Sequence, residues 1–418
     1  MKVVHVSNSD LNGGAAIAAL RINNALRKID VDSQMLVQKK LSLENSVKEL
    51  STGLTGTLSY GFRFLYDELS MRALTIKNRG RFTFPYFGTD ISTNEMIKNA
   101  DIINLHWING GFLSLKSFEK LKKINKPLVW TLHDMWAFTG GCHYNLGCEK
   151  YREFCNHCPS LKFHGSKDIS SKIFLRKSTI FNNLNITFVA CSNWLRKTAS
   201  SSRILKDKNI INIPNPIDLK VFRPHKKAEA RKILGLSVDK YLLLVGAMNL
   251  SDERKGFKYL LSALNYLFSK NQILRDKIEL LTFGKIDKMI ESNVPFKINK
   301  LGIISTSDKL VQIYNASDLY IAPSIQDNLP NTVLESIACG TPVVAFNIGG
   351  MSDLITSGEN GYLVEPESYK QIAGKIEYLI NNNEKLKLLS KRCREISEKK
   401  FEQSIVARQY KKLYAELI

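Results

Sequence analysis

The feature that most constrains the fold of this chain is an alternation of short apolar runs, rich in β-branched residues, with longer stretches that have the spacing of amphipathic helices. Strands that alternate with helices build parallel sheets, because each helix carries the chain back to the edge where the next strand starts. We expect two series of strands, at residues 3–6, 102–105, 128–132 and 187–190, and at 241–245, 279–283, 319–322 and 343–346. Each series predicts one doubly wound α/β sheet.

A proline-rich segment, IINIPNPIDLKVFRP at residues 210–224, separates the two series. Its three prolines break regular structure, so we place the domain junction there. The 418 residues are enough for two domains of about 200 residues each. We therefore expect Rossmann-like domains at residues 1–210 and 211–400. Residues 401–418 have the spacing of an amphipathic helix that is able to pack back on the first domain.

Charge and hydropathy narrow the class of protein. No apolar run approaches the roughly 18 residues of a membrane span, and the first residues, MKVVHVSNSD, lack the apolar centre of a signal peptide. We therefore expect a cytoplasmic protein.

The net charge is +21, of which residues 1–210 carry +14, with 30 Lys and Arg against 16 Asp and Glu. Nucleic acid, anionic lipid, a phosphorylated substrate or solubility alone would each explain this excess.

Residues that directly follow strands are the first candidates for function, since ligands of open parallel sheets bind beyond the carboxyl ends of the strands. Gly13 and Gly14 follow the first strand and would let the main chain approach a ligand closely, or would simply form a tight turn. His133 follows the strand at 128–132, where an imidazole can donate or accept a proton. The alternative for His133 is a structural histidine with satisfied ring nitrogens.

The second domain has a basic loop and an acidic segment in the same kind of position. Arg254 and Lys255 precede a helix, whose amino end already has partial positive charge, so two cations there are unfavourable unless an anion such as a diphosphate binds beside them. The alternative is that both side chains only face solvent. The segment DNLPNTVLE, residues 327–335, follows the strand at 319–322. We expect Asn331 to cap a short helix whose first amides hold phosphate or sugar oxygens, with Glu335 one turn into it.

In this order along the chain, the glycine loop, the histidine, the NPIDLKVFRP segment, the basic loop, the acidic pair and ACGTPVVAFNIGG resemble the family-4 glycosyltransferases of the GT-B fold. The resemblance covers nearly the whole chain. It implies two Rossmann-like domains that face each other across a cleft. It also implies a retaining transfer of sugar from a nucleotide diphosphate sugar, such as a UDP- or GDP-sugar, to a hydroxyl acceptor without a catalytic metal.

The resemblance assigns roles to the residues described above. Lys255, with Arg254, would neutralise the leaving diphosphate, and Glu335 would bind the ribose hydroxyls. Asp327 with the following main chain would hold the sugar ring, while His133 would contact the transferred sugar. Donor-binding roles fall on Gly13, Gly14, Asn328, Leu329, Pro330, Asn331 and Glu335, and catalytic roles fall on His133, Arg254, Lys255 and Asp327.

The chain departs from the family pattern at two places. The acidic pair is usually two glutamates, whereas position 327 is Asp, so we expect altered or water-mediated contact with the sugar. The arginine of the basic loop usually precedes the lysine by several residues, where Ala247 and Met248 stand in this chain. The assignment of Lys255 is therefore stronger than that of Arg254.

Other functions are compatible with the same residues. A nucleotide-sugar epimerase or a phosphorylase would share the fold. A basic nucleic-acid-binding protein is the alternative from another class, but the chain has no module typical of one, and we expect no nucleic acid partner. We expect a glycan or polyprenyl-linked acceptor in the synthesis of a bacterial surface polysaccharide.

Four of the seven cysteines fall within seventeen residues: Cys142, Cys148, Cys155 and Cys158. A cytoplasmic protein rarely keeps structural disulfides, so the spacing C-x5-C-x6-C-x2-C indicates either a structural zinc site or a set of reduced or redox-active thiols. The cluster follows His133 closely. We expect the four cysteines to hold a loop in place at the border of the active site.

A segment rich in basic and aromatic residues, 60–87, is typical of a membrane interface. A second basic stretch lies at residues 116–126. We expect peripheral binding to anionic lipid at the inner face of the cell membrane, or else a domain edge with a solvated basic rim. The residues of the first segment that carry this prediction are Arg63, Arg72, Lys77, Arg79 and Arg81, with Phe62, Phe64, Tyr66, Phe82, Phe84, Tyr86 and Phe87.

Overall fold

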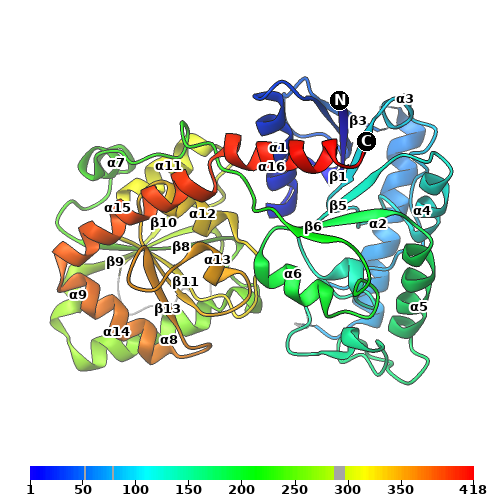
Figure 1. Ribbon diagram of the computed structural model, residues 1–418. Helices are drawn as coiled ribbons and strands as arrows, with labels where there is room; N and C mark the ends of the chain where they lie inside the picture. Colours follow the sequence, from blue (N-terminus) through cyan, green and yellow to red (C-terminus); the bar gives the residue numbers. More distant parts are fainter. Residues whose placement is uncertain (51–52, 78–79, 287–296) are drawn as a thin grey trace. The chain divides into compact units, whose positions relative to one another are not determined.

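The computed structural model describes residues 1–50, 53–77, 80–286 and 297–418. Within them the chain divides into two compact units, residues 1–216 with 406–418, and residues 217–405. Each unit is built around one sheet (Figure 1), and every strand pair of the described residues is parallel. Two parallel-sheet α/β domains are the fold class that the alternating sequence pattern predicts.

The first unit has a seven-stranded sheet of order β3-β2-β1-β4-β5-β6-β7. Its strands are β1 (Lys2–Ser9), β2 (Asp32–Lys39), β3 (Val47–Glu49), β4 (Ile102–Leu105), β5 (Leu128–Leu132), β6 (Ile186–Ala190) and β7 (Ile210–Asn212). Its helices are α1 (Gly14–Arg27), α2 (Leu54–Leu74), α3 (Glu95–Lys98), α4 (Leu115–Lys122), η1 (Trp136–Phe138), η2 (Lys150–Arg152), α5 (Ile169–Asn182), α6 (Asn193–Ser200) and α16 (Gln403–Ala415).

Alternate residues of each strand in this sheet face opposite layers of helices. Val4, Trp130 and Phe188 pack in one core with α4, α5 and α6. Val3 and Val129 belong to a second core with α1 and the C-terminal helix α16. Helices therefore cover both faces of the sheet, which explains why its strands read as continuous apolar runs.

The second unit has a six-stranded sheet of order β10-β9-β8-β11-β12-β13. Its strands are β8 (Tyr241–Asn249), β9 (Ile278–Lys285), β10 (Ile298–Lys300), β11 (Leu319–Ala322), β12 (Val343–Phe346) and β13 (Gly361–Val364). Its helices are α7 (Lys227–Leu234), η3 (Glu253–Lys255), α8 (Phe257–Lys270), α9 (Ile273–Lys277), α11 (Ser307–Ala316), α12 (Asn331–Ala338), α13 (Met351–Leu354), α14 (Tyr369–Ile380) and α15 (Asn383–Lys400).

Candidate functional site

Two cations and one buried carboxylate meet in the second unit. Lys255 Nζ lies 2.6 Å and Arg254 Nη1 lies 3.4 Å from Asp327 Oδ2. Burial alone would raise the pKa of Asp327, but Lys255 and Arg254 hold this pKa below its ordinary value. Asp327 is therefore an ionised carboxylate at neutral pH. The sequence predicted each of the three residues for the site, and the structure brings them together.

Local chain geometry fixes the basic loop against the end of β11. Asp252 accepts a hydrogen bond from Arg254 N at 3.0 Å, which starts the short helix η3. Gly256 follows with φ of +66°, and a Cβ at this position would lie 1.8 Å from Pro323 O. Only glycine allows this approach. It lets Arg254 O accept from Ile325 N at 2.9 Å and Arg254 Nη1 donate to Gln326 O at 3.0 Å.

The loop that carries Asp327 is held from the other side by Gly349 and Gly350. A Cβ on Gly349, whose φ is +54°, would lie 1.8 Å from Asp327 O. Gly350 N donates to the same oxygen at 3.3 Å. Because Gly349 and Gly350 have no side chains, the loop that carries Asp327 can lie close to the start of α13.

The acidic helix differs from the prediction at its first residue. The cap of α12 is Pro330, and Asn331 is the first helical residue rather than the cap. The reason is that proline has a fixed φ suited to the residue before a helix, so the turn starts one position earlier than the side-chain pattern indicates. The helix ends at Ala338, and Gly340 has the left-handed φ of +77° that closes many helices.

Glu335, one turn into α12, is almost fully buried. Its Oε2 accepts a hydrogen bond of 2.9 Å from the hydroxyl of Tyr314 on α11. Tyr320 on β11 lies near both acidic residues, because the charges of Glu335 and Asp327 each raise its pKa after the larger effect of burial. The two ends of the DNLPNTVLE segment thus border one region of the second unit.

In the first unit, the glycine loop leads directly from β1 into α1. Gly13 is the cap of α1, with φ of 98° and ψ of 165°, a conformation that favours glycine. Gly14 is the first residue of the helix, and a Cβ on Gly13 would meet open space. The glycine is therefore required by its backbone angles and not by a close neighbour.

His133 ends a row of buried side chains that crosses the sheet. His5 Nδ1 lies 2.9 Å from His106 Nε2, and His106 Nδ1 lies 3.0 Å from His133 Nε2. His133 Nδ1 in turn lies 3.6 Å from Cys191 Sγ. Both ring nitrogens of His133 therefore have partners within the protein, and its side chain is partly buried.

Burial keeps the three imidazoles of this row neutral. It lowers the pKa of His5 to about 3 and that of His133 to about 4, although Asp134 raises the latter slightly. The pKa of His106 is lowered well below its usual value by burial and by the other two rings. His133 is therefore a weak base at pH 7, which limits its use as a proton acceptor.

His106 and Cys191 were not among the predicted site residues, although the sequence holds a signal for them. Each follows the last residue of a strand directly, His106 after β4 and Cys191 after β6, as His133 follows β5. The rule that selects strand ends would have found all three.

A second polar group lies just beyond β5. Asp134 Oδ2 lies 2.6 Å from His143 Nδ1, and Asp134 Oδ1 accepts from Trp136 N at 2.8 Å. Lys177 on α5 is fully buried, bonds to the carbonyls of Trp136 and Thr139, and sits 3.5 Å from the Trp136 ring centroid. Burial lowers the pKa of Lys177 to about 7. These contacts tie the segment after β5 to α5.

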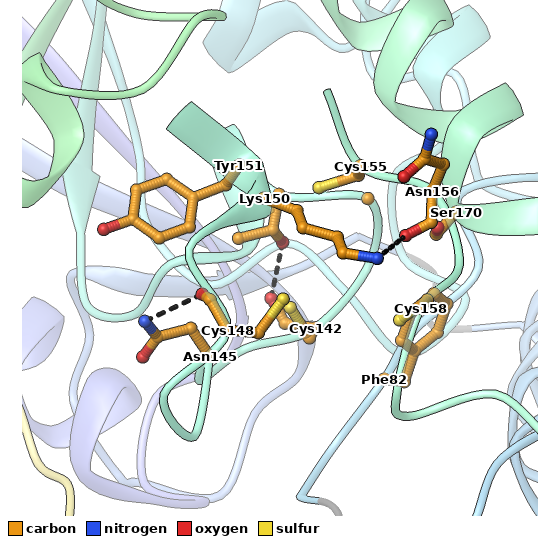
Figure 2. A pocket seen from close by; sticks show the side chains of 12 residues that line it. Phe82, Cys142, Asn145, Cys148, Lys150, Tyr151, Cys155, Asn156, Cys158 and Ser170 are labelled. Atoms are coloured by element: carbon orange, nitrogen blue, oxygen red, sulfur yellow. Dashed lines mark hydrogen bonds between the residues drawn. The ribbon is translucent and has the colours of Figure 1, made fainter. Parts of the chain in front are cut away.

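The four clustered cysteines line one pocket in this segment (Figure 2). Burial raises the pKa of Cys142 to about 12 and that of Cys158 above its usual value. All seven cysteines of the chain are free thiols in the structure. Within the described ranges, no three His, Cys, Asp or Glu side chains are gathered as a ready site for a metal ion.

Comparison with known proteins finds similarity to glycosyltransferases. Residues 239–382, which include the basic loop and the acidic helix, match the family model described as "Glycosyl transferases group 1". The chain is 27% identical over 283 residues to the putative colanic acid biosynthesis glycosyl transferase WcaC of Escherichia coli K12. It is 25% identical over 239 residues to an Escherichia coli UDP-Gal:alpha-D-GlcNAc-diphosphoundecaprenol alpha-1,3-galactosyltransferase.

These alignments span part of each protein. They cover 65% of this chain and 65% of the first relative, and 56% of this chain and 61% of the second. Over the full length, the fold matches the crystal structure of Anabaena HepE in complex with UDP, with a TM-score of 0.67, 15% identity and 100% coverage of both chains. Residues 239–382 are thus a glycosyl transferases group 1 domain, in a chain that has the GT-B fold.

Proposed function

We propose that this chain is a retaining, metal-independent glycosyltransferase that moves a sugar from a nucleotide diphosphate sugar to a hydroxyl of a glycan or lipid-linked acceptor in surface polysaccharide synthesis. The arrangement of Lys255 and Arg254 around Asp327 carries the proposal. The names of the relatives support the pathway and acceptor, since one refers to colanic acid and the other to a diphosphoundecaprenol-linked sugar. The UDP in the HepE structure supports the donor class.

Lys255 and Arg254 supply the charge that the reaction needs. Breaking the bond between a sugar and a diphosphate leaves negative charge on the departing phosphate, and fixed cations stabilise it. The side chain of Lys255 is 22% exposed, whereas that of Asp327 is 9% exposed. The ammonium group can therefore turn towards a diphosphate from solvent without leaving Asp327 unpaired, because Arg254 remains beside the carboxylate.

Asp327 is poorly suited to attack the sugar. A carboxylate that two cations hold in its ionised form is a weak base and a weak nucleophile, and a double-displacement mechanism needs a free one. We therefore favour transfer on one face of the sugar, in which the acceptor hydroxyl attacks beside the leaving group and a donor phosphate oxygen takes its proton. Asp327 then positions the sugar and the two cations.

A donor screen tests the proposal. Thermal unfolding would be measured with UDP- and GDP-sugars, since a ligand at about 100 times its Kd stabilises by about 2.7 kcal/mol. Stabilisation by one nucleotide sugar, followed by release of the nucleotide diphosphate only when a hydroxyl acceptor is present, is the expected result. Conversion of the donor without acceptor would indicate an epimerase, and transfer to inorganic phosphate would indicate a phosphorylase. Either result would contradict the proposal.

The lipid-linked acceptor implies work at a membrane surface, and α2 has the side chains for it. Five apolar residues, each 53% to 77% exposed, recur on one face of this helix at spacings of three or four: Leu54, Leu58, Phe62, Leu65 and Leu69. Two polar residues of α2 make contacts within the protein instead. Asp67 is buried and accepts from Phe84 N at 3.0 Å, and Arg63 donates to Gly111 O at 2.9 Å.

An apolar stripe of this size in a basic region fits an anionic lipid surface. Phe64, Tyr66 and Phe87 are also exposed, whereas Phe82 and Phe84 are core residues of the unit. Arg79, one of the basic residues predicted for this interface, lies outside the described residues. Within those residues no helix is both long and apolar enough to cross a bilayer. We propose peripheral binding at the inner face of the cell membrane.

Vesicle sedimentation tests this binding. The chain should sediment with phosphatidylglycerol vesicles at low salt and not with phosphatidylcholine vesicles. Phe62→Ser with Leu65→Ser should weaken binding about tenfold or more, which corresponds to about 1.4 kcal/mol. The control is Ile233→Ser with Leu388→Ser, which removes two exposed apolar side chains from helices of the second unit. Equal loss of binding in both double variants would contradict a role for α2.

A further inference from the structure

Four thiols line one pocket of the first unit, and none of them has a part in the proposed transfer reaction. Cys142, Cys148, Cys155 and Cys158 line this pocket, which is partly open to solvent. In Figure 2 the four side chains surround the space from different stretches of the loop.

We propose that these four cysteines bind one structural zinc ion as thiolates. Zinc in structural sites takes four ligands, and four cysteine thiolates are one of its common ligand sets. The residues that line the pocket include no Asp or Glu, so it lacks the carboxylate ligands that Ca²⁺ and Mg²⁺ favour. Soft thiolates in a site without carboxylates select zinc over these hard cations.

The surroundings offset the charge that such a centre would have. The negative charge of four thiolates exceeds the positive charge of one zinc ion, and the excess is unfavourable in a protein interior unless cations lie near. Lys177 is buried within electrostatic range of Cys142 and Cys155. Lys150 also lines the pocket, and its Nζ donates to the carbonyls of Asn156 and His157 at 3.1 and 3.2 Å, between the last two cysteines.

The main chain brings the cysteines together through contacts that leave little freedom. A Cβ on Gly140 would lie 3.0 Å from Cys155 Cβ, and a Cβ on Gly141 would lie 2.4 Å from the Phe82 ring. Cys158 N donates to Asp168 Oδ2 at 2.8 Å, which ties the last ligand to the cap of α5. The backbone is therefore built for the close approach of these segments.

The four side chains line the wall of the pocket, and zinc binding requires them to turn inward. Among the described residues no three potential ligands are grouped as a ready ion site. Neutral thiols have no reason to converge, because the attraction arises only when the metal displaces their protons. Cys148 follows a turn in which Leu146 and Gly147 both have positive φ, and its side chain is only partly buried.

A zinc ion here would fix the segment that follows β5. His143, next to Cys142, has its Nδ1 2.6 Å from Asp134 Oδ2, and Asp134 adjoins His133. His143 N also donates to Arg81 O, and Met135 N donates to His143 O, both at 3.0 Å. The ion would therefore hold in place the residues around the predicted sugar-contact histidine. This proposal does not depend on the reaction that the chain catalyses.

Metal analysis of the purified full chain tests the proposal. Mass spectrometry of the metals should find about one zinc per chain in the wild type, and much less than one in Cys155→Ser and Cys158→Ser. Cys339→Ser is the matched control, since Cys339 is a buried thiol of the second unit. It should keep its zinc. No zinc in the wild type, unchanged zinc in the two pocket variants, or iron with acid-labile sulfide would each overturn the proposal.

A measurement on the wild type covers the case in which a pocket variant fails to fold. An organomercurial that titrates thiols should release the zinc as the pocket thiols react, while a zinc-sensitive dye records the release. Replacement of zinc by Co²⁺ should give the intense thiolate-to-cobalt absorption of a tetrahedral site. Zinc that leaves before any thiol reacts, or cobalt without thiolate absorption, would show that the cysteines are not the ligands.

Discussion

Replacement of Lys255 by Ala removes the shorter of the two ion pairs that Asp327 makes with the basic loop. If Lys255 stabilises the leaving diphosphate, turnover should fall by roughly two to three orders of magnitude, the usual effect of losing one charge-stabilising donor. The structure also predicts a loss of stability. The Lys255–Asp327 hydrogen bond is 2.6 Å long, and a hydrogen bond to a charged group contributes about 1.5–3 kcal/mol.

The thermal shift follows from that range. For a domain of this size, about 1 kcal/mol changes Tm by about 2–4 °C, so the transition of the second unit should fall by about 3–12 °C. The loss stays within this range because Arg254 still lies 3.4 Å from the carboxylate. The effect also depends on pH. The folded pKa of Asp327 is lowered, so its contribution is present at neutral pH and disappears as pH falls through that lowered pKa, below 3.8.

The assay compares initial rates of nucleotide diphosphate release for wild type, Lys255→Ala and Lys258→Ala at a temperature well below both transitions. Lys258 lies in the first turn of α8 with an exposed side chain, so its loss removes the same charge from a nearby position. We expect Lys258→Ala to retain near-normal turnover. If Lys255→Ala also turns over within about threefold of wild type, or if the two variants lose the same activity, the assignment of Lys255 is wrong.

Three further predictions follow from the structure. Because burial lowers the pKa of His133 to about 4, the pH dependence of kcat near neutral pH should show no ionisation of this residue. ¹⁵N NMR should find its imidazole ring neutral. A ring that is protonated at about pH 6, close to the ordinary histidine pKa, would contradict this prediction. Gly349→Ala should weaken donor binding, since its Cβ would lie 1.8 Å from the main-chain oxygen of Asp327. The control is Gly358→Ala, because Gly358 also has a positive φ but a Cβ there would meet open space, so this variant should bind the donor normally. Equal donor affinity of the two variants in calorimetry would refute the steric argument. Tyr414→Phe should destabilise the first unit by about 1–3 kcal/mol, because it removes the hydroxyl that accepts a 2.6 Å hydrogen bond from the buried Asn104 amide. Urea unfolding would measure this loss. An unchanged unfolding midpoint would show that the contact is dispensable.

The sequence pattern predicted the central strands of both sheets and missed the outer ones. The eight predicted strands lie within β1, β4, β5, β6, β8, β9, β11 and β12, whose apolar runs are largely buried. Among the missed strands, β2 has eight residues, but polar residues flank its short apolar run of Met35, Leu36 and Val37. The others are shorter: β3, β7 and β10 have three residues each and β13 has four. Such short segments at or near a sheet edge are partly exposed and carry too few apolar residues to give a period.

Strand-end reasoning located the residues of the candidate site, but it could not show which of them interact. Lys255 and Asp327 are 72 positions apart, and only the closeness of the strand ends of β8 and β11 brings them together. The sequence therefore predicted a diphosphate as the anion beside the basic loop, whereas in the structure Asp327 already fills that role. In the proposed reaction the donor would share these two cations with Asp327, which the separate motifs do not reveal.

The row of histidines bears on where the proton of the acceptor hydroxyl goes. A general base near neutral pH needs a free lone pair and a pKa close to the working pH. His133 has neither, because His106 and Cys191 occupy its two ring nitrogens and its pKa is about 4. Asp327 is also a weak base, since two cations hold it ionised. Neither side chain is therefore suited to accept that proton, which is why we propose that a phosphate oxygen of the departing nucleotide accepts it, with transfer on one face of the sugar.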